Sequence, residues 1–304
     1  MAFVAVILSA VAWGVEFILI RVMLRETSAS CATFYTYFAT TVLLLLWSLG
    51  ARRISWRRIR PNLRLLFVIG LVGAFVNIAQ FKALDFTDPT SAAVIQRIQI
   101  LFAIILGWIA LRELPRWADL PAMAAMAFGF LALELQRGDI SVVRVGNLMV
   151  LGSALGLAVN ALLIKKLLRS TTIEMVSTVN SFLIMAWMLV LALATRGQVL
   201  AILHNPKLQY LTLAMGLFAA MSFLLYYFAL RELPLWLVSI MLLLIPVTSA
   251  ILQVFVLKED LAKGEIAGML LISAGAAALI LLHQRRANRD SAAPPDAELQ
   301  PKSL

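Results

Sequence analysis

The sequence predicts an all-α integral membrane protein with ten transmembrane helices, and composition, run length and an internal repeat support this prediction. Of the 304 residues, 62% are hydrophobic and only 14% are charged, and the mean hydropathy is +0.93. A soluble domain is about half apolar and one quarter charged, so the composition excludes one. The apolar residues also gather in runs of roughly 20, the length that a helix needs to cross a bilayer.

Ten apolar runs follow one another with short connections between most of them. They cover residues 2–24, 30–49, 65–86, 89–111, 117–135, 146–166, 173–195, 208–230, 235–257 and 262–283. Glu16 and Arg21 interrupt the first run, which also lacks a basic start, so we expect a retained helix and not a signal peptide. Residues 284–304 are polar and proline-rich, and we expect them to form a disordered cytoplasmic tail.

The formal net charge of +10 would suggest nucleic acid in a soluble chain. Here the cations lie between apolar runs, so we expect the lipid bilayer and no nucleic acid as partner. If the N-terminus is cytoplasmic, the segments on that side hold more than twice as many Lys and Arg residues as those on the other side. The positive-inside rule then predicts a multi-pass protein of the cell (inner) membrane with both termini cytoplasmic. We expect a monomer or a weak homodimer.

Two segments of the chain repeat each other. Residues 83–113 align with residues 229–259 without a gap, at an offset of 146 (229 minus 83). The alignment pairs Glu113 with Glu259, and both acids read as capping groups or surface pairs beside cations.

The repeat extends over both halves, residues 1–135 and 146–283. Ile20-Arg21 matches Ile164-Lys165 at an offset of 144 (164 minus 20). Five helices are an odd number, so the second copy must enter the membrane from the opposite side. This inverted repeat is typical of secondary transporters.

Several motifs together resemble one known family. They are WGVEFILIR, FKALDFTDPTSAA, YYFALRELPLWLVS, LIPVTSAILQVFVLKE and AGMLLISAGAAALIL. The chain resembles the EamA family of the drug/metabolite transporter superfamily. The resemblance implies two EamA repeats, a central cavity and alternating access, usually for export of amino acids or other small metabolites. One departure is that the family proline is present as Pro246, whereas the matching first-repeat position is Ile100, so the usual kink is not assured there.

Polar residues inside the spans are the candidate substrate-binding residues. An ionisable residue at mid-membrane costs about 2.5–3.5 kcal/mol on insertion scales, so such residues usually face a cavity or a partner. The candidates are Arg97, Glu16, Gln80, Asn77, Gln96, Gln99, Asn160, Tyr226 and Trp13.

Glu16 and Arg97 carry the strongest hypothesis. They lie at similar depths, so they could form a static ion pair between the first and fourth spans. Alternatively, one or both face the cavity. Arg97, nearly always charged, would then bind a carboxylate or phosphate. Glu16 would receive an amine or a proton, which makes it the candidate for proton coupling.

The second repeat offers weaker candidates. Asn160 corresponds to Glu16 at offset 144, and Tyr226 corresponds to Gln80 at offset 146. Trp13 and Tyr226 either stack on a ligand or fill the core. Pro246 predicts a hinge or a fixed kink, with nearby hydroxyls re-satisfying the freed backbone group.

No motif for catalysis, metal binding or a cofactor is present. The sequence has no P-loop and no HExxH, so we expect no enzyme, no cofactor, no metal and no ATP-driven pump. The leading interpretation is a permease that exports a small polar metabolite, an amino acid or related organic anion or zwitterion. The alternative is a flippase for a lipid-linked or phospholipid headgroup, which would need a polar groove open sideways to lipid.

Overall fold

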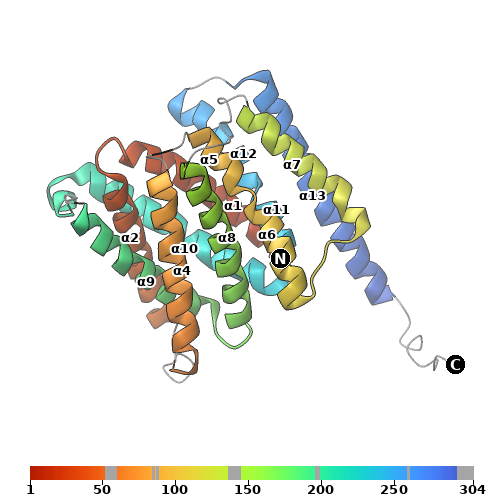
Figure 1. Cartoon of the computed structure of the whole chain (residues 1–304), viewed down its shortest axis with the longest axis horizontal. Coiled ribbons are helices and arrows are strands. Elements are labelled where there is room, and N and C mark those ends of the chain that lie inside the picture. Colours follow the sequence, from red (N-terminus) through yellow and green to blue (C-terminus); the bar gives the residue numbers. More distant parts are fainter. Residues whose placement is uncertain are drawn as a thin grey trace.

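The computed structural model describes residues 1–51, 60–83, 86, 89–135, 145–195, 199–258 and 261–292, and within these ranges it holds only helices and their connections (Figure 1). The first repeat contains α1 Ala2–Met23, α2 Ala29–Gly50, α4 Leu63–Ala83, α5 Pro89–Gln96, α6 Gln99–Leu111 and α7 Leu120–Leu135. The second contains α8 Val145–Leu167, α9 Ile173–Ala194, α10 Pro206–Glu232, α11 Leu235–Met241, α12 Leu244–Leu252 and α13 Lys263–Ala292.

These helices account for the ten expected spans. Within the described ranges, nine helical segments are long and apolar enough to cross a membrane, and α7 with the turn before it, Trp117–Leu133, is a shorter tenth. The fourth and ninth spans are each made of two short helices. Several starts are capped as their sequences suggest, since Ser28 accepts from the Cys31 amide and Thr172 from the Met175 amide, both at 3.4 Å.

The prediction that residues 284–304 form a disordered tail is wrong for the first part of this segment. Helix α13 continues past His283 to Ala292, and residues 293–304 lie outside the described ranges. The extension has a partner, because Arg286 binds Asp119 through two contacts of 2.8 and 3.0 Å. Asp119 is fully buried and also accepts from the Arg116 amide at 2.9 Å. This fork joins the end of α13 to the start of α7.

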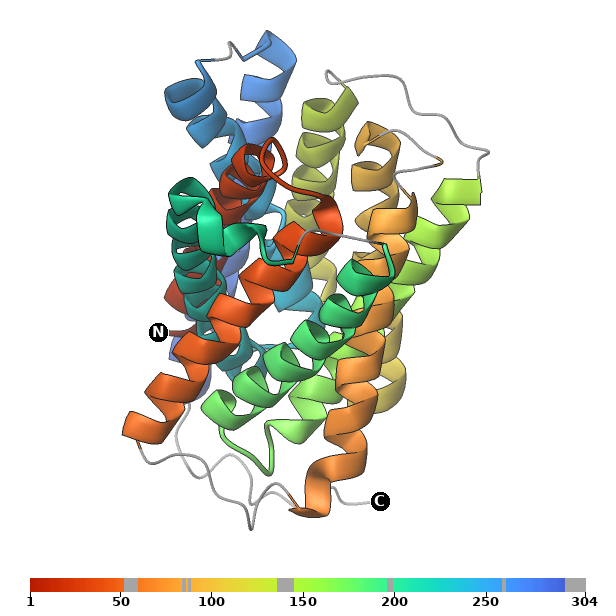
Figure 2. The same ribbon diagram turned by 90° about the vertical axis from the view of Figure 1, so that its left-hand side faces the viewer.

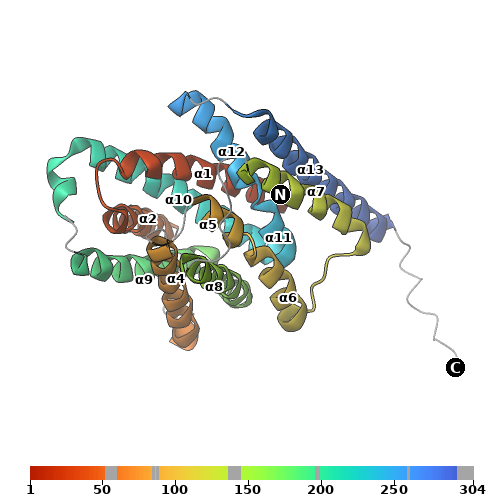
Figure 3. The same cartoon turned by 45° about the horizontal axis from the view of Figure 1, so that its top comes forward.

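Most of the helix packing joins one repeat to the other. Helix α1 packs on α10, α2 on α9, α4 on α8, and α7 on α13. In Figures 1 and 3, α7 and α13 lie together along one edge of the molecule, and α2 and α9 lie near the opposite edge. Figure 2 shows the bundle from the α2 side, with the helices running at a slant to one another.

The two ends of the α2–α9 contact show that these helices are antiparallel. The hydroxyls of Ser30 and Thr195 lie 3.0 Å apart at one end, and those of Ser48 and Thr178 lie 3.0 Å apart at the other. Equivalent helices of the two repeats therefore run in opposite directions, as an inverted repeat requires.

Helices α7 and α13 approach closely through glycines. A Cβ atom at Gly129 would lie 2.7 Å from the Gly268 carbonyl oxygen, and one at Gly275 would lie 2.7 Å from the Ala122 carbonyl oxygen. The offset of 146 converts one of these contacts into the other, since it relates Gly129 to Gly275 and Ala122 to Gly268. The pair is thus built with approximate two-fold symmetry.

The fourth and ninth spans also end alike. Arg112 (φ 58°) and Lys258 (φ 57°) adopt the left-handed conformation, and the offset of 146 relates them. Glycine usually holds this position. After Arg112, the amide of Glu113 returns to the Gly107 carbonyl at 3.0 Å, which closes the helix and turns Glu113 out of its axis.

Candidate functional site

The fourth span of each repeat is broken near its middle. The first break covers Arg97 and Ile98, and the second covers Leu242 and Leu243, so the two breaks nearly coincide at the offset of 146. In each, the amide donates to a carbonyl three residues earlier, at 3.1 Å for Arg97 and 3.0 Å for Leu243. Broken helices at matching positions of an inverted repeat are where secondary transporters bind their substrates.

Pro246 explains the second break, whereas no proline explains the first. Pro246 has no N–H for the Leu242 carbonyl, which instead accepts from Ile245 at 3.1 Å. Ile100 keeps its N–H, yet it bonds to the Arg97 carbonyl at 3.0 Å. The departure from the family pattern therefore does not remove the interruption. The polar QRIQ segment occupies it.

The hydroxyls after Pro246 have a different role from the expected one. Thr248 and Ser249 donate to the carbonyls of Leu244 (3.2 Å) and Ile245 (3.1 Å), which are not the group that Pro246 leaves free. They pack against α1 instead, where a Cβ at Gly14 would lie 2.6 Å from Thr248 Cβ. Helix α1 thus lies directly on the helix that follows the second break.

Five aromatic rings from α1, α2 and α10 form one connected group, called here the aromatic cluster. Its ring centroids lie 5.1 Å apart for Trp13–Tyr226 and 6.1 Å apart for both Trp13–Phe223 and Tyr37–Phe223. Tyr227 completes the cluster, 5.8 Å from Phe223 and 5.7 Å from Tyr226. Trp13 and Tyr226 were expected on the site, whereas Tyr37 and Phe223 were missed.

Glu16 lies one turn from Trp13 on α1, and its carboxylate is within electrostatic range of the Tyr37 hydroxyl. Its Oε2 atom is buried and has no hydrogen-bond partner among the described residues. A buried acceptor without a partner costs about 1–3 kcal/mol, and more when it is charged. Such a group in a folded protein requires an explanation.

Asn77 and Asn160 connect this region to the second repeat. Asn77 donates to the Gly73 carbonyl at 2.8 Å, and it also lies beside the Tyr37 hydroxyl. The amide nitrogen of Asn160 would be 3.4 Å from a Cβ placed on Gly73, so both amides face the same turn of α4. The Oδ1 atom of Asn160 is buried without a partner in the described part of the chain. Gln80 follows one turn beyond Asn77 and is half-buried.

The first break presents its polar side chains to two neighbouring helices. Gln96 Oε1 is 3.5 Å from the Ser153 hydroxyl on α8, and its Nε2 atom is buried without a partner among the described residues. Gln99 is also buried, and its Oε1 atom has no hydrogen-bond partner among the described residues. The Arg97 guanidinium lies over the Phe130 ring of α7, 5.5 Å from its centroid.

The structure does not bring Glu16 and Arg97 together as a static ion pair. Arg97 lies against Phe130 of α7, while Glu16 lies within electrostatic range of Tyr37 of α2. The two charges are therefore separate features of the site in this conformation. Sequence depth placed both residues in one layer, but it did not show in which direction each side chain leaves its helix.

Asn180 ties two helices together, as expected for an asparagine in a membrane bundle. It donates to the Tyr227 hydroxyl at 2.8 Å, and both side chains are buried. The contact fixes one edge of the aromatic cluster. Within the described ranges, no group of three His, Cys, Asp or Glu residues could hold a metal ion.

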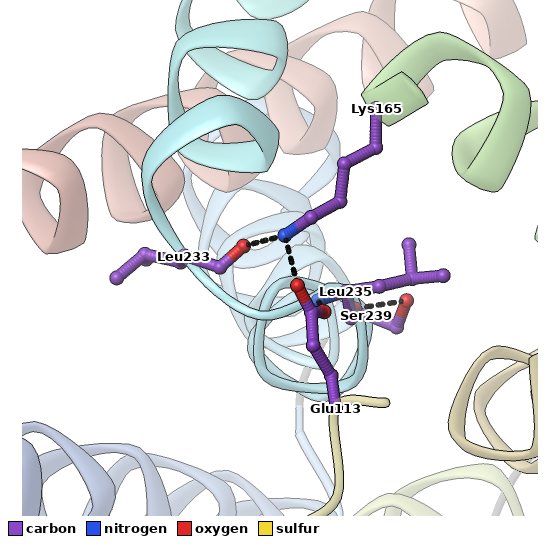
Figure 4. A network of polar contacts seen from close by, with 5 residues as sticks. All are labelled: Glu113, Lys165, Leu233, Leu235 and Ser239. Carbon is purple, nitrogen blue, oxygen red and sulfur yellow. Dashed lines mark hydrogen bonds and ion pairs between the residues drawn. The ribbon is translucent and has the colours of Figure 1, made fainter. Parts of the chain in front are cut away.

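A largely buried ion pair lies at the end of the bundle that carries Glu113. Its carboxylate pairs at 3.0 Å with Lys165, whose side chain is only 7% exposed (Figure 4). Glu113 was expected to be a capping group or a surface pair beside a cation. It does pair with a cation and accepts from the first amide of α11, but the pair is largely buried and joins the two repeats. Glu259, its counterpart in the sequence, lies outside the described residues.

Comparisons with known proteins agree with this architecture. The EamA-like transporter family matches residues 1–134 and again residues 144–281. An uncharacterized transporter from Methanothermobacter thermautotrophicus is 25% identical over 280 residues, covering 84% of this chain and 79% of that protein. A protein of known crystal structure superposes with a TM-score of 0.76 at 16% identity, over 93% of this chain and 98% of that one, and thus shows the fold. The chain therefore belongs to the EamA-like transporter family of the drug/metabolite transporter superfamily, and it is a membrane transporter with two EamA repeats.

Proposed function

We propose that the protein is a secondary-active permease that exports a small polar metabolite bearing an amino group, such as an amino acid, by alternating access. The observation that carries the proposal is the pair of broken spans at matching positions, flanked by buried polar atoms from both repeats that have no partner among the described residues. Exchanging the conformations of two inverted repeats opens a shared site first to one side and then to the other.

Glu16 and the aromatic cluster support an amine as the group that is bound. A carboxylate without a partner attracts a cation strongly where the dielectric constant is low. Aromatic faces within about 6 Å add cation–π attraction, of about 0.5–2 kcal/mol for each ring in contact. Trp13 lies one turn from Glu16 on α1, and Tyr37 lies within electrostatic range of its carboxylate, so the aromatic cluster offers rings close to Glu16. The amides of Asn77 and Asn160 supply further hydrogen bonds.

Arg97 with Gln96 and Gln99 would recognise the opposite end of a zwitterion. Arg97 now stacks on Phe130. A guanidinium offers two parallel donors to one carboxylate, which suits Arg97 to the acid group of a zwitterion. The site is then divided into an amine pole on α1 and a carboxylate pole at the first break.

Energy for export would come from a gradient, and Glu16 is the carboxylate suited to couple it to protons. A proton and a substrate amine would compete for the same oxygen atoms, so each would displace the other. Exchange of a proton for a substrate amine at Glu16 therefore requires only this one binding site.

The test is transport into proteoliposomes, screening amino acids, organic acids and nucleosides with the wild type, Glu16→Gln and Arg97→Ala. We expect Glu16→Gln to fold normally but to lose the pH dependence and most of the rate for the amino compound. Arg97→Ala should transport zwitterions more slowly than the wild type does, while its rate for simple amines should fall less. Glu232→Gln is the matched control, because Glu232 is exposed and, within the described part of the chain, pairs with its neighbour Arg231 at 3.0 Å.

Two outcomes would contradict the proposal. A Glu16→Gln variant with an unchanged pH profile would remove Glu16 from coupling. Transfer of short-chain fluorescent phospholipids between leaflets, without flux of any water-soluble compound, would favour a headgroup flippase.

A further inference from the structure

Three polar contacts join helix ends at one end of the bundle, and a fourth lies within α11 beside them (Figure 4). Glu113 follows α6, Lys165 lies in the last turn of α8, and Leu233 and Leu235 flank the turn between α10 and α11. Glu113 Oε1 lies 3.0 Å from Lys165 Nζ, and Glu113 Oε2 accepts from the Leu235 amide at 2.7 Å. Lys165 Nζ also donates to the Leu233 carbonyl, and the Ser239 hydroxyl donates to the Leu235 carbonyl at 2.9 Å.

Each group in this network fills a defined role. The carboxylate accepts from the ammonium group and from a backbone N–H, while the ammonium group donates to a backbone carbonyl. The Lys165 side chain is 7% exposed and that of Glu113 is 22% exposed. Breaking a buried pair costs more than making it contributes, because one charge is left without its partner. The contact is therefore costly to open.

The elements that the network joins are those that alternating access must separate. Glu113 belongs to the first repeat, whereas Lys165 and the α10–α11 turn belong to the second. The turn leads into α11, all of whose residues are buried and which packs on α6. Helix α11 is the first half of the broken ninth span. The network therefore holds together the two broken spans at one of their ends.

The first repeat lacks parts of this arrangement in the described conformation. Arg21 matches Lys165 at the offset of 144, but Arg21 is exposed on the surface. Pro89 matches Leu235 at the offset of 146, and a proline has no N–H to offer a carboxylate. The bundle is thus fastened at the Lys165 end by contacts that the sequence does not repeat at the other end.

We propose that Glu113, Lys165 and the backbone groups of Leu233 and Leu235 form a latch that closes the Lys165 end of the transporter, the end that the positive-inside rule places in the cytoplasm. The latch rests on the proposed function, since it closes the cytoplasmic entrance of the same site. Opening that entrance requires the carboxylate to release both Lys165 and the Leu235 amide. The described structure is then the state closed on that side.

The experiment measures access from the latch side without any substrate. Cys31 is the single cysteine and is buried, so a Cys31→Ala background allows one reporter, Ser239→Cys, on α11 one turn behind the latch. Labelling by a membrane-impermeant methanethiosulfonate is followed in inside-out and right-side-out vesicles. Glu113→Gln and Lys165→Met should raise the labelling rate from the latch side about tenfold, equivalent to about 1.4 kcal/mol. Glu232→Gln, which breaks an exposed pair, should leave the rate unchanged.

Two further variants separate the latch from a simple ion pair. The exchange Glu113→Lys with Lys165→Glu keeps opposite charges but faces an ammonium group with the Leu235 N–H and a carboxylate with the Leu233 carbonyl. We expect it to label as fast as the single variants. Leu235→Pro copies the first repeat and removes only one donor from the network, and Pro234, at φ −55° and ψ 143°, is compatible with a following proline. It should also speed labelling while both charges stay in place.

The outcomes are distinguishable from those of the transport assay. Equal labelling of wild type and Glu113→Gln, with both proteins melting at similar temperatures, would overturn the latch whatever the transport result. If the variant with Glu113→Lys and Lys165→Glu labels as slowly as the wild type, the backbone groups have no role in the latch. If Glu113→Gln yields too little folded protein, Leu235→Pro supplies the same comparison. Faster labelling without flux of any compound would support the latch and contradict the permease.

Discussion

At the scale of single residues, the polar groups of this membrane protein fall into two kinds. Lys165 and Asp119 are buried and ion-paired, each with a charged partner at 3.0 Å or less and a backbone contact. Asn160 and Gln99 are buried and Glu16 is partly buried, and each keeps a buried atom without a partner in the described structure. The first kind holds helices together, and the second kind is suited to a visiting ligand.

Glu26 gives a pH-dependent contribution to stability outside the spans. The hydrogen bond from Lys207, whose Nζ lies 2.6 Å from Glu26 Oε1, and its positive charge lower the pKa of Glu26 below its ordinary value of 4.5. A carboxyl group with a lowered folded-state pKa stabilises the fold at neutral pH, and this contribution is lost as the pH falls through that pKa.

We therefore expect Glu26→Gln to reduce the loss of melting temperature between pH 7 and pH 4. The effect should be small and should shrink in high salt, because the pair is exposed. Thermal melts in detergent at low and high salt provide the measurement. A larger acid sensitivity in the variant would reverse the assigned sign.

At the scale of helices, the matching breaks show which features depend on a proline. Pro246 accounts for the second break through its missing N–H, but the first break forms around Arg97 and Ile98 without one. The lengths of the apolar runs predicted the positions of the spans, because a helix needs only enough apolar residues to cross the bilayer. They could not place Arg97 over Phe130, because that depends on the rotation of each helix about its axis.

The sequence also did not reveal contacts between side chains of distant helices. Tyr37 and Phe223 lie in spans that read as ordinary core, and their meeting joins α2 to α10 across the two repeats. Glu113 read as a helix-end group because its partner, Lys165, lies far away in the sequence. The useful signal was the pairing of Ile20-Arg21 with Ile164-Lys165, which marks both cations as parts of the repeated unit.

The α7–α13 contact gives a prediction at this scale. Gly129→Ala would place its Cβ 2.7 Å from the Gly268 carbonyl oxygen, a backbone atom that cannot move aside. We expect a loss of about 1–3 kcal/mol, typical of overpacking, and a lower melting temperature. Gly152→Ala is the control, because its nearest neighbour is Phe75 Cζ at 4.0 Å, so the better helix propensity of alanine should leave stability equal or higher. Equal melting of Gly129→Ala and wild type would show that the two helices separate easily.

At the scale of the whole molecule, composition and repeat were sufficient to predict the fold. Their combination required two antiparallel copies, and the antiparallel α2–α9 contact agrees with it. The orientation in the membrane remains a prediction from loop charge. Ser170, between α8 and α9, and His204, between α9 and α10, are both exposed and should lie on opposite sides.

In a Cys31→Ala background, Ser170→Cys should therefore react with an impermeant thiol reagent only in inside-out vesicles. His204→Cys should react only in right-side-out vesicles. Reaction of both cysteines in the same vesicle preparation would contradict the ten-span topology. Reversed sidedness of both would keep the topology and invert the orientation.

Because α1, α2, α4 and α7 each find their main neighbour in the other half of the chain, neither half possesses a core of its own. During synthesis the amino-terminal five spans must wait in the bilayer, their contact faces covered only by lipid or by a chaperone, until the later spans emerge. A gene divided between residues 135 and 145 should accordingly yield two polypeptides that are each degraded when made singly and that persist when made together.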